Sequence, residues 1–294
     1  MSTPRPGSTP RAVLRATRPL QWTKNSVVFA ALVFAGRLTD PPSVFLAVLA
    51  FIAFCMVSGA VYLVNDVRDI EADRLHPTKR HRPIPSGHLS VNLALSIAAM
   101  LVIASLALSL WIRPSFAAMT AAYLVLMLAY SFGLKHVVIL DVVLIAVGFV
   151  IRAAAGAVAI DVVISPWLLA CTLLLALFLG FGKRRHELAH VEAAAHRPNL
   201  ESYTLPLLDQ LLVVTATATV VSYLLYTIET RAKFGTDALI LTVPFVAFAL
   251  FRYLFLLHRR GEGGRPESLL FSDKPLLLAI IAWGLTCVAV LYLA

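Results

Sequence analysis

Nine mostly apolar stretches follow one another along the chain and are separated by shorter polar segments. Each is about as long as an α-helix must be to cross the hydrocarbon core of a bilayer, which takes about 20 apolar residues. They cover residues 20–35, 43–64, 91–112, 115–133, 137–160, 166–182, 206–229, 238–257 and 275–293. The pattern predicts an all-α polytopic membrane protein with nine transmembrane helices, built as a single domain over residues 1–294.

The composition agrees with this membrane prediction. Hydrophobic residues make up 60% of the chain and charged residues 14%, with a mean hydropathy of +0.84, whereas soluble domains are about 45 to 50% apolar. The cysteines at 55, 171 and 287 all fall inside predicted spans. Their scattered positions favour packing roles over disulfides or metal ligation.

The distribution of basic residues predicts the orientation of the spans. Residues 1–19 are polar, Pro-rich and basic, so they read as a cytosolic tail and not as a signal peptide. With the N-terminus in the cytosol, 20 of the 25 Lys and Arg residues fall on the cytosolic side, four on the opposite side, and Arg152 within a span. The four on the opposite side are Arg37, Arg113, Arg231 and Lys233. This asymmetry predicts a protein of the inner (plasma) membrane with its C-terminus on the periplasmic side.

The net charge of +9 suits anionic lipid and phosphorylated substrates, and no segment reads as a nucleic-acid module. Most polar residues lie in two cytosolic segments, residues 65–90 and 183–205, which are predicted to be active-site loops. The bilayer and two anionic substrates are therefore the expected partners.

The first polar segment begins with regularly spaced carboxylates. Asn65, Asp66, Asp69 and Asp73 recur at intervals of three and four, so on a helix their side chains stack along one face. Stacked carboxylates repel one another unless a cation lies between them, and hard oxygen ligands suit Mg²⁺. The spacing predicts a magnesium site at the cytosolic end of the second span.

Basic residues follow these carboxylates directly. Lys79, His81 and Arg82 lie in a loop that Pro77, Pro83 and Pro85 stiffen. Cations held beside a metal-binding face form a pocket for a diphosphate. The competing interpretation is a solvated acidic helix end followed by a basic loop that only sets the orientation of the spans.

The second polar segment contains two overlapping patterns. Residues 180–190 read GFGKRRHELAH, in which His186, Glu187 and His190 match the HExxH arrangement of zinc proteases. HExxH has only three fixed residues, and Lys183 and Arg184 just before it favour an anion-binding site instead.

Two ionisable residues lie inside the predicted span 137–160. Asp141 and Arg152 share one face of that helix but are about 16 Å apart, so they are expected to bind separate partners. For Arg152, a purely structural role that satisfies helix carbonyls remains an alternative.

Residues 65–73, NDVRDIEAD, resemble the NDxxDxxxD signature of the UbiA-type prenyltransferase superfamily, and RPIPSG at 82–87 resembles its downstream loop. Members typically carry a second aspartate-rich segment after the sixth span, where this chain has KRRHE. That departure is similar to the branch that joins phosphoribose to polyprenyl phosphates. RPLQWTKN (18–25), YSFGLKH (130–136), DVVLIAVGFVIRAAAG (141–156) and GKRRHEL (182–188) also resemble this branch.

The resemblance implies a nine-helix UbiA-like bundle and a reaction in which phosphoribosyl pyrophosphate gives its 5-phosphoribosyl group to decaprenyl or another polyprenyl phosphate, releasing pyrophosphate. The product is a precursor of cell-wall arabinan. Mg²⁺ is the implied cofactor, with Asp66, Asp69 and Asp73 as ligands, and Lys79 and Arg82 as further catalytic residues. The implied substrate-binding residues are Lys24, Asn25, Asn65, His81, Tyr130, Lys135, Asp141, Arg152, Lys183, Arg184 and Glu187. Whether a homo-oligomer forms is left open.

Three other functions stay open at this point. The nearest is a Mg²⁺-dependent transfer of a polyprenyl group to an aromatic acceptor. A membrane zinc metalloprotease needs a third protein ligand that the sequence does not identify. A transporter is disfavoured because the charged residues cluster at the cytosolic ends of the spans and not near the midplane.

Overall fold

A computed structural model of the chain describes residues 9–189, 200, 202–235, 237–259, 269 and 272–293. Within these ranges every regular element is a helix, so the prediction of an all-α protein is confirmed. The chain forms two compact units. The first comprises residues 1–32, 37–132 and 151–163, and the second comprises residues 33–36, 133–150 and 164–294. Each unit is described by itself.

Among the described residues, eight helices are long and apolar enough to cross a membrane. They are α3 (Pro41–Arg68), α5 (Val91–Ile112), α6 (Pro114–Phe132), α7 (Leu140–Ala159), α8 (Pro166–Ala189), α10 (Leu205–Phe234), the segment from η5 (Ala238–Thr242) through α11 (Val243–Arg259), and α13 (Lys274–Leu293). They match eight of the nine predicted spans.

The remaining predicted span, residues 20–35, differs from the expected α-helix. It consists of a 3₁₀-helix, η1 (Pro19–Phe29), followed by the short helix α2 (Ala30–Phe34). Apolar content does not distinguish a 3₁₀-helix from an α-helix, and 3₁₀ runs longer than about four residues are uncommon. A continuous α-helix over this span was therefore the wrong expectation.

The helix ends explain why most boundaries were predictable. Helices α3, α6 and α8 begin at Pro41, Pro114 and Pro166, where proline is favoured because its missing N–H needs no intrahelical partner. The Ser90 hydroxyl caps α5, and Gly235, with φ of 72°, ends α10.

The two predicted active-site loops are partly helical. In the first, α3 runs to Arg68 and is followed by α4 (Ile70–Leu75) and the 3₁₀ turn η2 (Lys79–His81). In the second, α8 continues to Ala189. Residues 65–68 and 183–189 are thus helical extensions of the spans. Their charged side chains have partners, such as Arg82 for Asp66 and Glu187 for Arg184.

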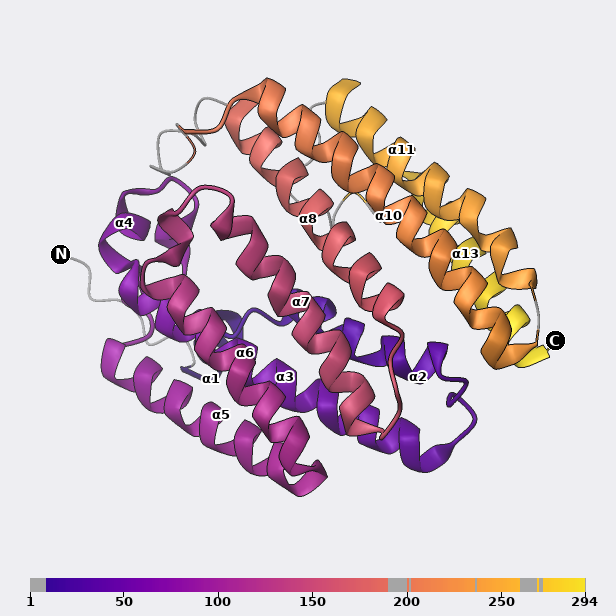
Figure 1. The fold of residues 1–294 in the computed structure, drawn as a ribbon. Coiled ribbons are helices and arrows are strands. Elements are labelled where there is room, and N and C mark those ends of the chain that lie inside the picture. The colour runs from indigo at the N-terminus through magenta and orange to yellow at the C-terminus, as the bar shows by residue number, and fades with distance from the viewer. Residues whose placement is uncertain are drawn as a thin grey trace. The chain divides into compact units, whose positions relative to one another are not determined.

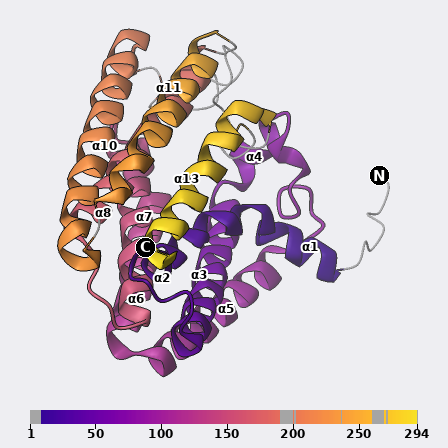
Figure 2. The same cartoon turned by 90° about the vertical axis from the view of Figure 1, so that its right-hand side faces the viewer.

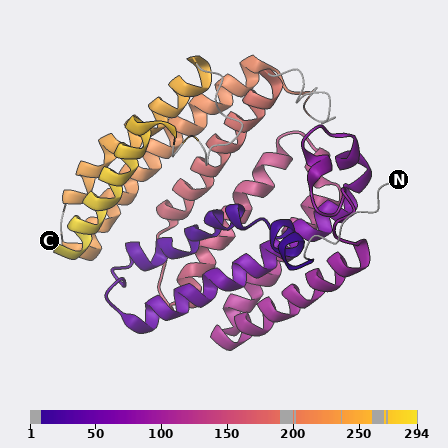
Figure 3. The ribbon, with the colours of Figure 1, turned by 180° about the vertical axis from the view of Figure 1, so that it is seen from behind.

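In the first unit, α3 packs along α5, α6 and η1 (Figure 1), and the short helix α1 (Thr9–Ala16) lies beside α3 (Figure 3). Its core contains Phe54, Phe116 and Tyr123, whose rings meet edge to face. In the second unit, α8 and α10 run side by side, α11 lies next to α10, and α13 next to α11 (Figure 2).

Close backbone contact in the first unit depends on Gly156 of α7. A Cβ atom added there would lie 2.0 Å from the carbonyl oxygen of Val28 in η1, and small residues allow such helix contacts in membrane proteins. We expect Gly156→Ala to lower the free energy of unfolding by about 1 to 3 kcal/mol, the usual cost of overpacking. The measurement is the thermal unfolding midpoint in detergent.

Gly284 in α13 provides a matched control because nothing lies within 4 Å of a Cβ added there. Gly284→Ala should leave the unfolding midpoint unchanged. Equal midpoints for the two variants would contradict the close approach of η1 to α7.

Candidate active site

Two of the predicted carboxylates lie close together at the C-terminal end of α3, the end that is predicted to face the cytosol. Asp66 lies in the last turn of α3 and Asp73 in α4, and their residues are 1% and 3% exposed. Oδ1 of Asp66 and Oδ2 of Asp73 lie 3.0 and 2.6 Å from the same nitrogen, Nη1 of Arg82. The structure therefore brings these three predicted site residues together.

Asp69 is arranged differently from the other two aspartates. It is the junction residue between α3 and α4, with φ of −91° and ψ of 13°, so the three carboxylates do not stack along one continuous helix as expected. Its Oδ2 accepts a hydrogen bond from Nδ2 of Asn65 at 3.1 Å. The break in the helix lets Asp66 and Asp73 face one cation while Asp69 pairs with Asn65.

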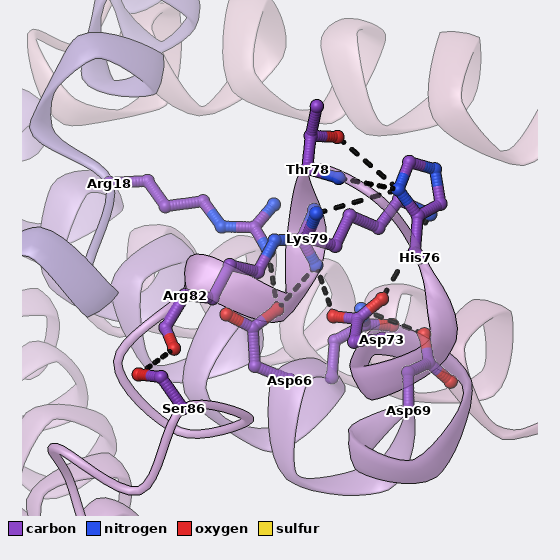
Figure 4. A network of polar contacts seen from close by, with 10 residues as sticks. Arg18, Asp66, Asp69, Asp73, His76, Thr78, Lys79, Arg82 and Ser86 are labelled. Carbon is purple, nitrogen blue, oxygen red and sulfur yellow. Dashed lines mark hydrogen bonds and ion pairs between the residues drawn. The ribbon is translucent and has the colours of Figure 1, made fainter.

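Two further cations surround the buried pair of aspartates. Arg18 donates to Oδ1 of Asp66, and Nζ of Lys79 lies 4.0 Å from Oδ1 of Asp73. Figure 4 shows the side chains of Arg18, Arg82 and Lys79 converging on the two carboxylates. With three cations and two carboxylates, the cluster has a formal net charge of +1, which favours binding of an anionic group.

The loop after α4 holds Arg82 in place. The carbonyl oxygen of Arg82 accepts from Oγ of Ser86 at 2.6 Å, and its N–H donates to the carbonyl of Lys79 at 2.9 Å. Ile84 and Leu89, 1% and 2% exposed, anchor the same loop in an apolar cluster. The prolines and these buried side chains fix the backbone of Arg82, while its side chain remains 27% exposed.

Arg18 is a functional candidate that was not among the predicted site residues, although it begins the segment RPLQWTKN. It has φ of 54°, a left-handed conformation that is strained for a non-glycine residue and unusual before proline. Its guanidinium carbon lies 4.8 Å from the centre of the Tyr62 ring. The signals available for it were its charge at the start of an apolar segment and its place at the head of the RPLQWTKN segment.

A buried polar network in the first unit contains two predicted substrate-binding residues. Asn25, 1% exposed, donates to Oγ of Ser58 at 3.1 Å and accepts from Nε of Arg152 at 2.9 Å. Arg152 also donates to the hydroxyl of Tyr123 at 2.6 Å and stacks on its ring. The network joins η1, α3, α6 and α7 within this unit, and Tyr123 is a member that the sequence did not identify.

A second polar cluster lies in the second unit. Nε of Arg184 donates to Oδ2 of Asp141 at 2.8 Å, and its Nη1 lies 2.5 Å from Oε2 of Glu187. The hydroxyl of Tyr203 donates to Oδ1 of Asp141 at 2.9 Å and accepts from the N–H of Ile139 at 2.6 Å. Asp141 and Arg152 thus have separate partners, which confirms that expectation.

The chemistry of this second cluster is that of a buried ion pair. The side chains of Asp141 and Arg184 are 0% and 3% exposed. Burial raises the pKa of Tyr203 to about 12, so its phenol stays protonated and donates to Asp141 at neutral pH. The side chain of Lys183, in contrast, is 47% exposed and lies 4.0 Å from Glu187.

The remaining predicted site residues are spread over η1, η2, α6 and η3. His81 is exposed and accepts from Nε of Arg80, Lys24 is half-buried in η1, Tyr130 lies near the end of α6, and Lys135 belongs to η3 (Leu134–His136). Arg252 of α11 was not predicted as a site residue, and it donates two hydrogen bonds to Asp273, at 3.0 and 2.8 Å.

The zinc interpretation loses its support in the described part of the chain. Glu187 is held by Arg184, whereas the protease mechanism needs this carboxylate as a general base, and His190 lies outside the described residues. Within the described residues, no three His, Cys, Asp or Glu side chains are grouped to hold a metal ion as they stand.

Asp66 and Asp73 nevertheless fit a magnesium ion by chemistry. Both are hard oxygen donors, and they converge on one point that a cationic nitrogen occupies. Mg²⁺ is usually bound by one or two carboxylates, with water and substrate phosphates completing its shell. Two converging aspartates beside three cations are therefore suited to a metal-bound diphosphate.

Known proteins resemble this chain along most of its length. The UbiA prenyltransferase family matches residues 26–272. Decaprenyl-phosphate phosphoribosyltransferase of Mycolicibacterium smegmatis is 39% identical over 95% of this chain and 92% of its own length. The enzyme of the same name from Corynebacterium glutamicum is 38% identical over 96% of this chain and 87% of its own length.

A solved structure shares the fold. A UbiA homolog from Archaeoglobus fulgidus, bound to GPP and Mg²⁺, superposes with a TM-score of 0.72 over 95% of this chain and 99% of its own, at 18% identity. The fold, the family match over most of the chain and the two relatives lead to one conclusion. The chain belongs to the UbiA prenyltransferase family.

Proposed function

We propose that the protein transfers the 5-phosphoribosyl group of phosphoribosyl pyrophosphate to a polyprenyl phosphate, with decaprenyl phosphate as the expected acceptor, and releases pyrophosphate. The observation that carries this proposal is the 39% identity to a decaprenyl-phosphate phosphoribosyltransferase along almost the entire length of both chains. The cationic surroundings of Asp66 and Asp73 support it, because both substrates are anionic.

The reaction forms a bond between a phosphate oxygen of the lipid and C1 of the ribose, and it breaks the bond between C1 and the pyrophosphate oxygen. The attacking phosphate is already anionic at neutral pH, so no strong general base is needed. Catalysis then rests on orientation and on stabilising the charge of the leaving pyrophosphate. A single displacement of this kind inverts the configuration at C1.

Residues of the first unit have separate proposed roles in this step. Asp66 and Asp73, with Asp69 nearby, would hold Mg²⁺, which when bound stabilises charge on the pyrophosphate. Arg82, Lys79 and Arg18 bind phosphate oxygens through charge-assisted hydrogen bonds, and His81 lies on the same loop. Lys24 is proposed to bind the phosphate of the lipid substrate.

The other predicted residues have either a binding or a positioning role in the proposal. Lys183 and Lys135 of the second unit and Tyr130 of the first unit are proposed to bind phosphate groups. Arg184 and Asp141 act as positioning residues because their side chains are buried against each other. Glu187 orients Lys183, and Asn25 and Arg152 position η1 within its own unit through their hydrogen bond.

We also propose nine membrane crossings, with the N-terminus in the cytosol and the polar clusters on the cytosolic side of the plasma membrane. The eleven residues of η1 and five of α2 span about 30 Å at a rise of about 2.0 and 1.5 Å per residue. That length equals the hydrocarbon thickness of about 30 Å, so this segment supplies the ninth crossing. The asymmetric distribution of Lys and Arg supports the orientation.

The direct test uses purified protein in detergent with Mg²⁺, radiolabelled phosphoribosyl pyrophosphate and decaprenyl phosphate. We expect Mg²⁺-dependent transfer of label into the lipid phase and no transfer after chelation. The alternative, prenyl transfer to an aromatic ring, is tested in parallel with a prenyl diphosphate and 4-hydroxybenzoate. Product only in the parallel assay would refute the phosphoribosyl proposal.

A further inference from the structure

Arg82 occupies the position between the two carboxylates that would hold the metal ion. Its Nη1 lies 3.0 Å from Oδ1 of Asp66 and 2.6 Å from Oδ2 of Asp73. Both aspartates are buried, so leaving their charges without a cation is costly in this environment. Arg82 therefore serves as an internal counter-ion for the pair.

A divalent cation and this guanidinium cannot share the space between the two oxygens. Mg²⁺ binds oxygen at about 2.0 to 2.1 Å, closer than the hydrogen bonds that Arg82 now makes, and the two cations repel each other. For a metal ion to bind Asp66 and Asp73 together, the guanidinium has to leave them.

The side chain of Arg82 can leave the two carboxylates without a movement of its loop. The Arg82 backbone is held by Lys79 and Ser86, while the side chain is 27% exposed. A change of side-chain rotamer therefore moves the guanidinium, and the fixed backbone keeps it beside the carboxylates. A phosphate oxygen that arrives with the metal is a suitable new partner for it.

We propose that Arg82 competes with the metal for Asp66 and Asp73 and transfers its hydrogen bonds to the diphosphate when the two ligands bind together. Metal alone then binds weakly because it must displace Arg82 without compensation. Metal and diphosphate bind cooperatively because the phosphate stabilises the displaced guanidinium. This inference rests on the proposed function only in taking a diphosphate as substrate.

The test measures binding and not turnover. Mn²⁺ replaces Mg²⁺ and is titrated onto the detergent-purified full chain, with free Mn²⁺ followed by electron paramagnetic resonance. Labelled inorganic pyrophosphate is then measured by equilibrium dialysis at a fixed excess of Mn²⁺. For Arg82→Gln we expect Mn²⁺ alone to bind more tightly, on the order of tenfold, and pyrophosphate to bind more weakly by a similar factor.

Opposite changes in the two affinities distinguish competition from other roles of Arg82. A purely structural role predicts that both affinities fall, and a role in phosphate binding alone predicts unchanged Mn²⁺ binding. Either result would overturn the proposal. Arg82→Lys keeps the positive charge and is the second variant to use if Arg82→Gln folds poorly. It should retain the weak Mn²⁺ binding of the unmodified protein.

Arg80→Gln is the matched control because Arg80 lies in the same loop and, within the described residues, its side chain donates a hydrogen bond to the exposed His81 and not to Asp66 or Asp73. It removes the same charge, so an equal gain in Mn²⁺ affinity would show a general electrostatic effect and contradict the proposal. Neither measurement uses ribose or an acceptor lipid. Failure of the transfer assay would therefore leave these results unaffected.

Discussion

Replacing Asp66 with asparagine is expected to lower the rate of phosphoribosyl transfer by about a thousandfold or more, which corresponds to about 4 kcal/mol of transition-state stabilisation. Asparagine keeps the shape of the side chain but removes the charge that Arg18 and Arg82 face and that a metal ion requires. The measurement is the initial rate of label transfer at saturating Mg²⁺.

The control for Asp66→Asn is Asp161→Asn. Asp161 pairs with Arg113 at 2.5 Å, and both side chains are exposed, so the change removes an equal charge from an exposed pair without touching the cluster. Its rate should match that of the unmodified protein. A folded Asp66→Asn protein that keeps its Mg²⁺-dependent rate would refute the role of Asp66.

The largest loss of stability is expected from Arg184→Met. The variant leaves Asp141 charged and buried without its guanidinium partner, while Tyr203 still donates a hydrogen bond to it. Breaking a buried ion pair by removing one partner costs about 3 to 5 kcal/mol. Thermal unfolding in detergent should show a clear fall in the midpoint.

A second substitution identifies the cause of that fall. In the double variant Asp141→Asn with Arg184→Met no charge is left uncompensated at this contact, so part of the lost stability should return. If instead Arg184→Met is as stable as the unmodified protein but raises the KM for phosphoribosyl pyrophosphate, then Arg184 binds substrate directly and the positioning role is wrong.

Much of the fold could be predicted from the order of apolar and polar residues along the chain. Apolar stretches of membrane length predict eight of the helices; residues such as Pro114 and Pro166 mark where a helix begins, and Gly235 marks the end of α10. The largest difference is at α8, which was expected to end at residue 182 and runs to Ala189. The segment from Pro19 to Phe34 could not be predicted in the same way. Its side chains contact residues far away in sequence, as in the hydrogen bond from Asn25 to Ser58, and no local pattern shows such contacts.

The candidate site was predictable where its residues are neighbours in the chain. Asp66, Asp73 and Arg82 lie within 17 consecutive residues, so spacing and charge identified them together. Arg18 reaches Asp66 from 48 residues away through a left-handed turn, and no local pattern indicates that contact. Tyr123 and Tyr203 lie in or beside apolar segments, and the sequence there does not indicate which hydrogen-bond partner a tyrosine has.

The polar character of η1 bears on how the protein is inserted during synthesis. Gln21, Thr23, Lys24 and Asn25 lie in this first segment, and polar residues of this kind oppose transfer of an isolated segment into lipid. Asn25 donates a hydrogen bond to Ser58 of α3, and Val28 lies in one apolar cluster with Phe54 of α3. If η1 and α2 form the first crossing, we infer that they enter the bilayer together with α3 as a hairpin, so that this polar segment depends on the helix that follows it for its place in the membrane.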